Sequence, residues 1–107
     1  MIEIREYVLE NDESPFRNWF DELDPQAAVG VETAIRRLSE GNTSNARSIG
    51  EGAAKLKINR YRVYFGWDGK VLVILLDGGT KRRQQDDIEA ALRRWRDYKL
   101  RKSGKRS

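Results

Sequence analysis

The sequence predicts an α+β domain with a largely antiparallel sheet, and three observations lead to that prediction. Apolar and polar residues alternate near the N-terminus and again from about residue 53 to residue 65. Apolar residues recur at helical spacing in residues 16–38 and again near the C-terminus. The resulting order of elements is strand, helix, helix, three strands and helix, which is typical of the α+β class.

The first strand and the first helix follow from local patterns. Ile2 and Ile4 alternate with charged residues, which favours a half-buried strand running to about Leu9. Ser14-Pro15 has the form of a helix N-cap followed by a first-turn proline. The residues at helical spacing after this start are Phe16, Trp19, Phe20 and Leu23. A short amphipathic helix is therefore expected, with these side chains in the core.

A second helix begins directly afterwards. Asp24-Pro25 repeats the start signal, and Gly41-Asn42 stops the pattern. The apolar stripe between them consists of Ala28, Val31, Ile35 and Leu38. Two helices on such a short connection form an αα-hairpin.

Three strands are expected next. Residues 53–58 alternate with Lys55 and Lys57 on the polar parity, and residues 60–65 alternate in the same way. Gly66–Gly69 contains Asp-Gly and predicts a hairpin turn. Val71–Leu76 is apolar on both parities, so it is expected inside the sheet with both faces covered, and Gly78-Gly79 is expected to end it.

The last helix carries an apolar face and an arginine-rich face. The apolar positions are Ile88, Ala91, Leu92 and Trp95. Residues 1–100 are thus expected to form a single domain, and the basic residues 101–107 a disordered tail. Asp86-Asp87 fits helix-start acids better than a metal pair, because adjacent helical residues diverge by about 100°.

The amino-acid composition limits the catalytic groups and metal ligands that the chain can provide. The 107 residues contain no cysteine and no histidine, which removes thiolate chemistry and the commonest general base, and we expect no metal site and no cofactor. The chain has no long apolar run and no secretory start, so it is expected in the cytoplasm without membrane contact. Residues 1–40 carry a net charge of −6 and residues 41–107 one of +10. The two parts are expected to meet different partners, with a polyanion for the basic part.

Several segments taken together resemble a known family. They are Gly50-Glu51-Gly52, Tyr61-Arg62-Val63-Tyr64-Phe65, Leu72-Val73-Ile74-Leu75-Leu76, Gly78-Gly79-Thr80-Lys81, Asp87-Ile88 and Trp95-Arg96-Asp97-Tyr98. In order and spacing they resemble the phage-derived, HigB-like addiction-module killer proteins of the RelE/HigB superfamily, the toxins of type II toxin-antitoxin systems. The resemblance covers nearly the whole chain and implies a RelE-like fold.

The resemblance also implies an activity and partners. Such proteins are messenger-RNA endonucleases (mRNA interferases) that inhibit translation, commonly on the ribosome, and an antitoxin neutralises them. That antitoxin commonly carries a helix-turn-helix domain, so contact with operator DNA is expected only through it. The superfamily's active surface maps here onto a catalytic set of Lys55, Lys57, Arg62 and Arg82 and an RNA-binding set of Arg60, Tyr64, Lys81 and Arg83.

Arginine, lysine and tyrosine side chains differ in their ability to accept and donate protons, so different catalytic roles are expected for them. RNA cleavage without a metal uses the 2′-hydroxyl as nucleophile, and arginine cannot accept its proton. Arg62 and Arg82 are therefore expected to hold phosphate and stabilise charge, whereas Lys55 or Lys57 is the candidate base because crowded cations lower a lysine pKa. Tyr64 is expected to stack on a base or to donate a proton. Relatives often carry an acidic residue and an arginine where Lys55 and Lys57 stand. The resemblance therefore does not identify the general base or the general acid.

Arg62 is expected to point outward from the middle of its strand. Its replacement by alanine would then leave the fold intact and lower cleavage by about 10²–10³-fold. Two other functions remain open. One is a non-catalytic nucleic-acid-binding or co-repressor module, and the other is a degenerate toxin that only binds its antitoxin. Alternating cations are also common on a merely solvated sheet face.

Overall fold

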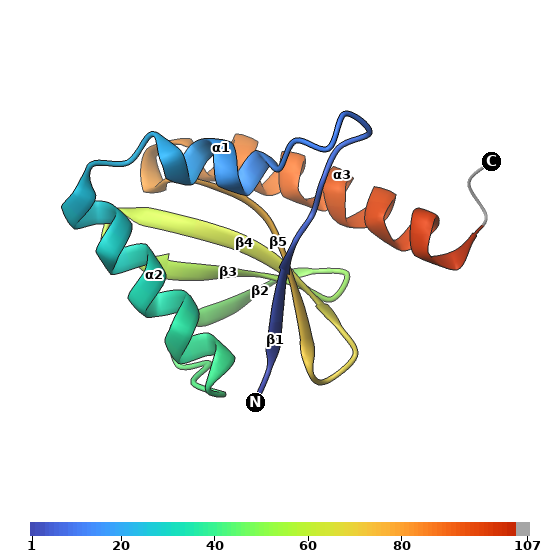
Figure 1. Ribbon diagram of the computed structural model, residues 1–107, viewed down its shortest axis with the longest axis horizontal. Coiled ribbons are helices and arrows are strands. Elements are labelled where there is room, and N and C mark those ends of the chain that lie inside the picture. Colours follow the sequence, from blue (N-terminus) through green and yellow to red (C-terminus); the bar gives the residue numbers. More distant parts are fainter. Residues whose placement is uncertain (105–107) are drawn as a thin grey trace.

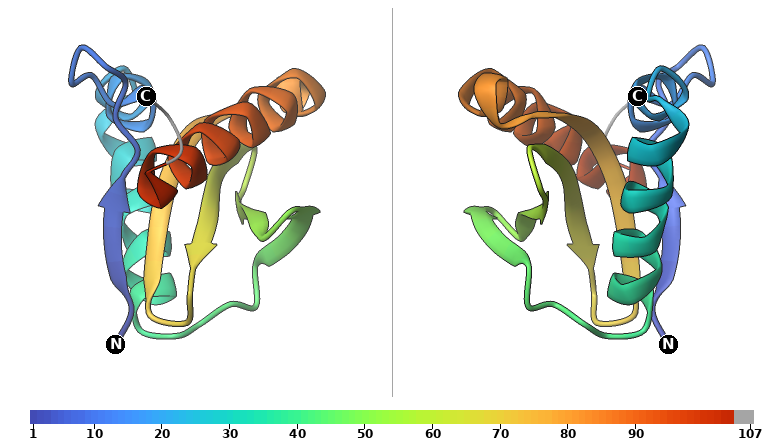
Figure 2. Two further views of the ribbon diagram at one scale, coloured as in Figure 1. Left: turned by 90° about the vertical axis from the view of Figure 1, so that its right-hand side faces the viewer. Right: turned by 90° about the vertical axis from the view of Figure 1, so that its left-hand side faces the viewer.

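Two helices on one face and one long helix on the other enclose a five-stranded sheet (Figures 1 and 2). The structure is a computed structural model that describes residues 1–104. The elements are β1 (Glu3–Glu6), α1 (Pro15–Asp21), α2 (Pro25–Ser39), β2 (Ala46–Gly50), β3 (Ala53–Ile58), β4 (Tyr61–Asp68), β5 (Leu72–Thr80), the 3₁₀ helix η1 (Lys81–Arg83) and α3 (Gln84–Ser103). The predicted α+β class, N-terminal strand and C-terminal helix are confirmed, and two consecutive helices, α1 and α2, lie where the αα-hairpin was predicted.

The helix starts follow the predicted signals. The Ser14 side chain accepts a hydrogen bond from the Arg17 amide at 3.0 Å, and Asp24 accepts one from the Ala27 amide at 2.9 Å. In both helices proline occupies the first turn, where no amide donor is needed. The N-cap chemistry therefore determines where α1 and α2 begin.

The sheet has the strand order β1-β5-β4-β3-β2. All pairs are antiparallel except β1 with β5, which is parallel, so the predicted largely antiparallel sheet is confirmed. The sequence pattern does not predict β2, which is an edge strand whose Arg47 and Ser48 are exposed. Such a strand needs no apolar alternation, because backbone pairing with β3 holds it.

Each face of the sheet has its own core. One core lies under α1 and α2 and includes Phe16, Val31, Leu38, Val63 and Phe65, all 2% exposed or less. The other lies under α3 and consists of Tyr7, Ala53, Tyr64, Ile74, Leu76, Ala91 and Trp95. Residues 73–76 of β5 are buried, as predicted, since both layers cover them, but the predicted burial of Val71 is wrong, because Val71 precedes the strand and is 64% exposed.

Two turn predictions are wrong. β4 continues to Asp68, and the turn lies at residues 69–71, where Gly69 has a φ of 74°. Gly78 and Gly79 do not end β5 but lie within it, because larger side chains need their space. A Cβ at Gly78 would enter the indole ring of Trp19, and one at Gly79 would collide with the Asp87 carboxylate.

The C-terminal boundary also differs from the prediction. α3 runs through Ser103, and Arg101 is tied down, with Nη1 donating to the Val8 carbonyl oxygen at 2.6 Å and Nη2 pairing with Asp97 at 2.6 Å. Gly104 then caps the helix at a φ of 72°. Residues 105–107 of the predicted tail lie outside the described residues. Within residues 1–104 no helix combines the length and the apolar character that crossing a membrane requires.

Candidate nucleic-acid interface

The predicted site residues on β3 and β4 share one face of the sheet. Lys57 lies opposite Arg62 and Lys55 lies opposite Tyr64, as their common parity predicted. Arg60 does not join this face. Ile58 pairs with Tyr61, so Asn59 and Arg60 form the two-residue turn between the strands.

Arg62 and Tyr64 do not point into solvent, and the prediction of an outward Arg62 is wrong. Arg62 is 4% exposed and Tyr64 is 0% exposed. Both lie on the sheet face that α3 covers, and α3 packs on their strand and on β5. A tyrosine buried in this way cannot stack on an RNA base, so the role predicted for Tyr64 is also wrong.

The guanidinium of Arg62 forms hydrogen bonds that stabilise the turn between β3 and β4. Its Nη1 donates to the carbonyl oxygens of Asn59 and Tyr61 at 2.8 Å each, and its Nε donates to Oε1 of Gln84 at 3.2 Å. Asn59 has a φ of 52°, a conformation that costs energy for a residue other than glycine. Arg62 therefore links the β3–β4 turn to the first turn of α3 and positions both.

Replacing Arg62 with alanine is expected to destabilise the protein by roughly 2–4 kcal/mol, because three partly buried acceptors lose their donor and a cavity opens where the buried side chain was. Arg62→Lys restores charge but not three bonds from one planar group, so it recovers only part of the stability. Urea unfolding measures both effects. The control is Lys57→Ala, which removes the exposed cross-strand neighbour. Equal stability of the Arg62 and Lys57 variants would contradict the bracing role.

Tyr64 carries the one buried side-chain oxygen or nitrogen in residues 1–104 that has no hydrogen-bond partner. Burial raises the pKa of its hydroxyl to about 12, with the nearby Asp87 acting in the same direction. The hydroxyl is therefore neutral and enclosed at physiological pH. Because the hydroxyl is enclosed, a ligand bound at the surface has no direct access to it.

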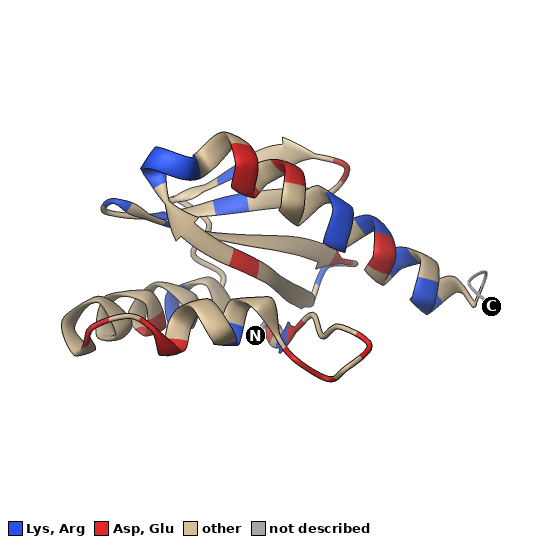
Figure 3. Ribbon diagram, turned by 90° about the horizontal axis from the view of Figure 1, so that it is seen from above, with Lys and Arg blue, Asp and Glu red and all other residues tan. Residues whose placement is uncertain are grey.

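The exposed cations gather at one end of the sheet. The η1 residues Lys81, Arg82 and Arg83 are all exposed and follow β5 directly. The Lys81 amide donates to the Arg60 carbonyl oxygen at 2.7 Å, which holds η1 against the β3–β4 turn. Figure 3 shows this basic end opposite the C-terminus. We call it the basic end, and it consists of Lys57, Arg60, Lys81, Arg82 and Arg83.

Charge pairing distinguishes the basic end from much of α3. In the described part of the chain, no residue of the basic end forms an ion pair. On α3, by contrast, Arg94, Arg96, Arg101 and Lys102 pair with acidic residues. The five cations of the basic end, which lie close together in the fold, are therefore available to a polyanion.

A hollow of about 710 Å³ opens in the basic end and is lined by Arg60, Tyr61, Thr80, Lys81 and Arg82. Tyr61 is its aromatic wall and is only half-buried. The Arg60 guanidinium lies 5.2 Å from the centre of the Tyr61 ring, and Trp19 supports that ring edge-on at 6.1 Å. Tyr61 lies on the apolar parity of its strand, yet it is the tyrosine that a base could reach.

Two carboxylates near the buried Tyr64 were not recognised as site residues from the sequence. An irregular register between Tyr64 and Phe65 places Asp77 opposite Tyr64, on the side of α3. Asp77 accepts hydrogen bonds from Arg94 Nη1 at 2.6 Å and from the Gly78 amide at 2.8 Å. Asp87 lies over Gly79, whose cross-strand neighbour is Arg62. Glycine at position 79 leaves space for the Asp87 carboxylate, and this glycine is the sequence feature that could have indicated the placement.

The electrostatics of this pair favour protonation. Burial raises the pKa of Asp77, although Arg94 opposes the shift. Burial also raises the pKa of Asp87, and the neighbouring Asp77 carboxylate adds to it. Asp87 is thus a half-buried carboxyl next to cationic groups, which is a suitable environment for a group that accepts and returns a proton.

Asp87→Asn is expected to raise the melting temperature at pH 7. A carboxyl whose pKa is higher in the folded than in the unfolded state stabilises the fold most below its unfolded pKa of about 3.9, and that contribution falls as the pH rises through the folded pKa. The neutral amide avoids this loss, so its advantage should shrink towards pH 3. Thermal unfolding from pH 3 to pH 8 measures it, with exposed Asp86→Asn as control. An advantage independent of pH would contradict the explanation.

Comparison with known proteins provides one relative. Over 80 residues the chain is 38% identical to an uncharacterized protein of Haemophilus influenzae strain Rd, in an alignment that covers 71% of this chain and 81% of that protein. No family model matches the chain. At this identity and coverage, the chain belongs to the same protein family as the Haemophilus influenzae protein.

Proposed function

We propose that the protein is an endoribonuclease that cuts messenger RNA as the toxin of a type II toxin-antitoxin system of the RelE/HigB type. The observation that carries the proposal is the basic end, where unpaired cations surround a hollow with an aromatic wall. Unpaired cations bind phosphates, and aromatic rings hold the unstacked bases of single-stranded RNA. The whole-chain resemblance to HigB-like killer proteins adds the reaction and the cytoplasmic setting on the ribosome.

The proposed mechanism assigns phosphate binding to Arg82, Lys81, Arg60 and Arg83. The substrate's 2′-hydroxyl attacks the adjacent phosphorus, the bond to the 5′-oxygen breaks, and a 2′,3′-cyclic phosphate and a free 5′-hydroxyl result. Lys57 is the exposed candidate for the base, and Lys55 is half-buried beside Arg47. Asp87 is a further candidate proton carrier. Arg62 takes part as a positioning residue behind Lys57.

The test is expression of the chain alone in bacteria. We expect growth arrest and shortened messenger RNA, both reversed when the product of the neighbouring gene is coexpressed as antitoxin. Purified protein should cut RNA on prefixed ribosome complexes in the presence of chelator, because the proposed chemistry needs no divalent ion. Normal growth at a verified high level of folded protein would overturn the proposal.

The second candidate function is RNA binding without cleavage. The burial of Arg62 and Tyr64 favours it, because the surface then presents fewer groups able to move protons. Gel-shift binding together with intact RNA after long incubation would identify this function. Lys57→Ala separates the two candidates, since it should abolish cleavage by the enzyme but weaken binding only modestly.

A further inference from the structure

A second hollow, of about 350 Å³, adjoins the basic end on the side of α2. It lies between the N-terminal part of α2 and the turn that joins β3 to β4, two segments that lie side by side (Figure 1). Arg60 and Tyr61 line this hollow and also the hollow of about 710 Å³ in the basic end, so the two spaces share a wall. A chain held at the basic end can therefore place one of its groups in the second hollow.

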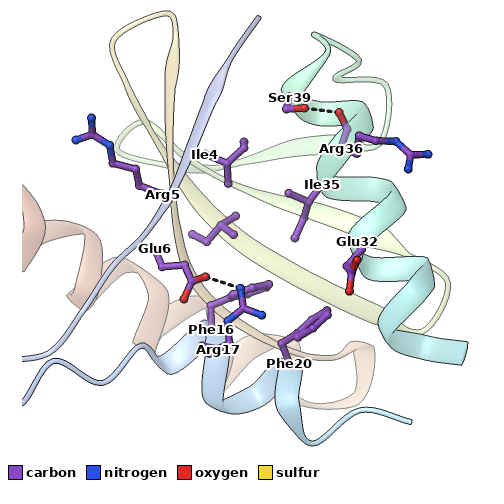
Figure 4. A pocket seen from close by; sticks show the side chains of 11 residues that line it. Ile4, Arg5, Glu6, Phe16, Arg17, Phe20, Glu32, Ile35, Arg36 and Ser39 are labelled. Carbon is purple, nitrogen blue, oxygen red and sulfur yellow. Dashed lines mark hydrogen bonds and ion pairs between the residues drawn. The ribbon is translucent and has the colours of Figure 1, made fainter. Parts of the chain in front are cut away.

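A separate groove of about 810 Å³ lies between β1, α1 and α2 (Figure 4). It shares no lining residue with the basic end or with the second hollow. Two of its arginines, Arg5 and Arg17, already pair with glutamates. The groove therefore does not continue the cationic surface, whereas the second hollow does.

The polar groups of the second hollow differ from those of the basic end. Asp24 and Gln26 contribute a carboxylate and an amide, and both residues are exposed. Oδ1 of Asp24 accepts the hydrogen bond from the Ala27 amide that caps α2, whereas Oδ2 forms no hydrogen bond within residues 1–104. The Gln26 side chain likewise has no hydrogen-bond partner in the described part of the chain. Because a carboxylate repels phosphate, this lining fits a part of RNA other than its backbone.

The remaining walls of the second hollow are apolar or aromatic. Ala27, Gly30 and Ile58 line it, and the Tyr61 ring lines it as well. A Cβ at Gly30 would lie 4.0 Å from Cγ2 of Ile58, so these two residues approach each other closely. Trp19 holds the Tyr61 ring in place by its edge-on contact. A nucleobase has the matching chemistry, because its faces are aromatic and its edge carries hydrogen-bond donors and acceptors.

We propose that the second hollow binds a guanine base of single-stranded RNA while the basic end holds the adjoining phosphates. Guanine has two neighbouring N–H donors, at N1 and N2, beside the acceptor O6. The Asp24 carboxylate accepts from these donors, and the Gln26 amide donates to O6. Adenine has an acceptor at N1, and neither uracil nor cytosine has two neighbouring N–H donors, so each of these bases leaves an unmatched group. The inference rests on the RNA binding of the proposed function and not on its cleavage step.

The experiment measures how the full-length protein binds uridine octamers that carry one central guanine, hypoxanthine or adenine, by fluorescence anisotropy. We expect the guanine octamer to bind about tenfold more tightly than the adenine octamer, because matched pairs of hydrogen bonds discriminate between bases to this degree. Hypoxanthine lacks the amino group at C2 and should give an intermediate affinity. The NMR signal of the Ala27 amide should shift more with guanine than with adenine, since this amide is bonded to Asp24.

Asp24→Asn separates base recognition from helix capping. Asparagine caps a helix as well as aspartate does, so the fold should persist, but its NH₂ group would face the guanine donors and the tenfold preference should disappear. The control is Asp21→Asn, which removes the same charge from an exposed residue of α1 outside the hollow and should keep the preference. Replacing Lys81 and Arg82 with alanine should weaken all the octamers and also keep the preference.

The outcomes distinguish this inference from the proposed function. Equal binding of the guanine and adenine octamers would overturn the inference, and so would a preference that survives in Asp24→Asn. RNA cleavage by a protein without guanine preference would overturn the inference and leave the proposed function standing. A guanine preference in a protein that leaves RNA intact would support the inference and overturn only the proposed cleavage.

Discussion

Replacing Lys81 and Arg82 together with alanine is expected to lower RNA affinity on the order of 100-fold at low salt and to reduce cleavage in proportion. Both side chains are exposed, line the hollow and lack acidic partners in the described part of the chain. The slope of log affinity against log salt concentration should fall by about 1.4, since each phosphate contact with a single strand contributes roughly 0.7. Filter binding across a salt series measures both quantities.

The control for this prediction is the double variant Arg36→Ala, Arg37→Ala. It removes the same net charge from the exposed side of α2, on the acidic half of the molecule. Affinity and salt slope should change little, because these cations lie away from the basic end. If both double variants weakened binding equally, net charge and not the basic end would explain RNA binding.

Gly78→Ala is expected to destabilise the protein, with a loss of roughly 1–3 kcal/mol in the free energy of unfolding. The new Cβ would occupy the space of the Trp19 indole ring, so Trp19 must move. Trp19 supports Tyr61, whose ring lines the hollow, and RNA binding should therefore fall as well. The melting temperature should drop by roughly 4–8 °C for each kcal/mol lost.

Gly30→Ala is the matched control for that variant. Its new Cβ would lie 4.0 Å from Cγ2 of Ile58, an ordinary contact, and Gly30 is inside α2. Alanine there should stabilise the helix by about 0.5–1 kcal/mol. A destabilised Gly30→Ala together with a neutral Gly78→Ala would contradict the packing described for the face of the sheet that α1 and α2 cover.

Local chemistry in the sequence determined where most elements lie. The caps at Ser14 and Asp24 start their helices by bonds to residues three positions away, and alternation over residues 53–58 reports a strand with one buried side. The run at residues 73–76 reports burial on both faces. These signals act over a few residues, so a linear pattern records them.

Tertiary structure alone decided the composition of the basic end. The alternating pattern places Lys57, Arg62 and Tyr64 on one face of the sheet. It does not show that α3 covers this face over β4. That helix buries Arg62 and Tyr64, whereas Lys57 on β3 stays exposed. Parity likewise could not reveal that Tyr61 borders a hollow, since η1 supplies the other side. Which half of an alternating pattern meets solvent depends on the layer that packs against it.

The sequence by itself determined the α+β class, the order of its predicted elements and the separation of acidic and basic halves, because each follows from residue type and local spacing. Long-range packing decided the rest. Gly78 and Gly79, which were expected to end the strand, lie within β5 because Trp19 and Asp87 occupy the space beside them. An irregular register next to Phe65 brought Asp77 beside Tyr64. Contacts between residues far apart in the chain produce no periodic pattern in the sequence, so only the folded structure reveals them.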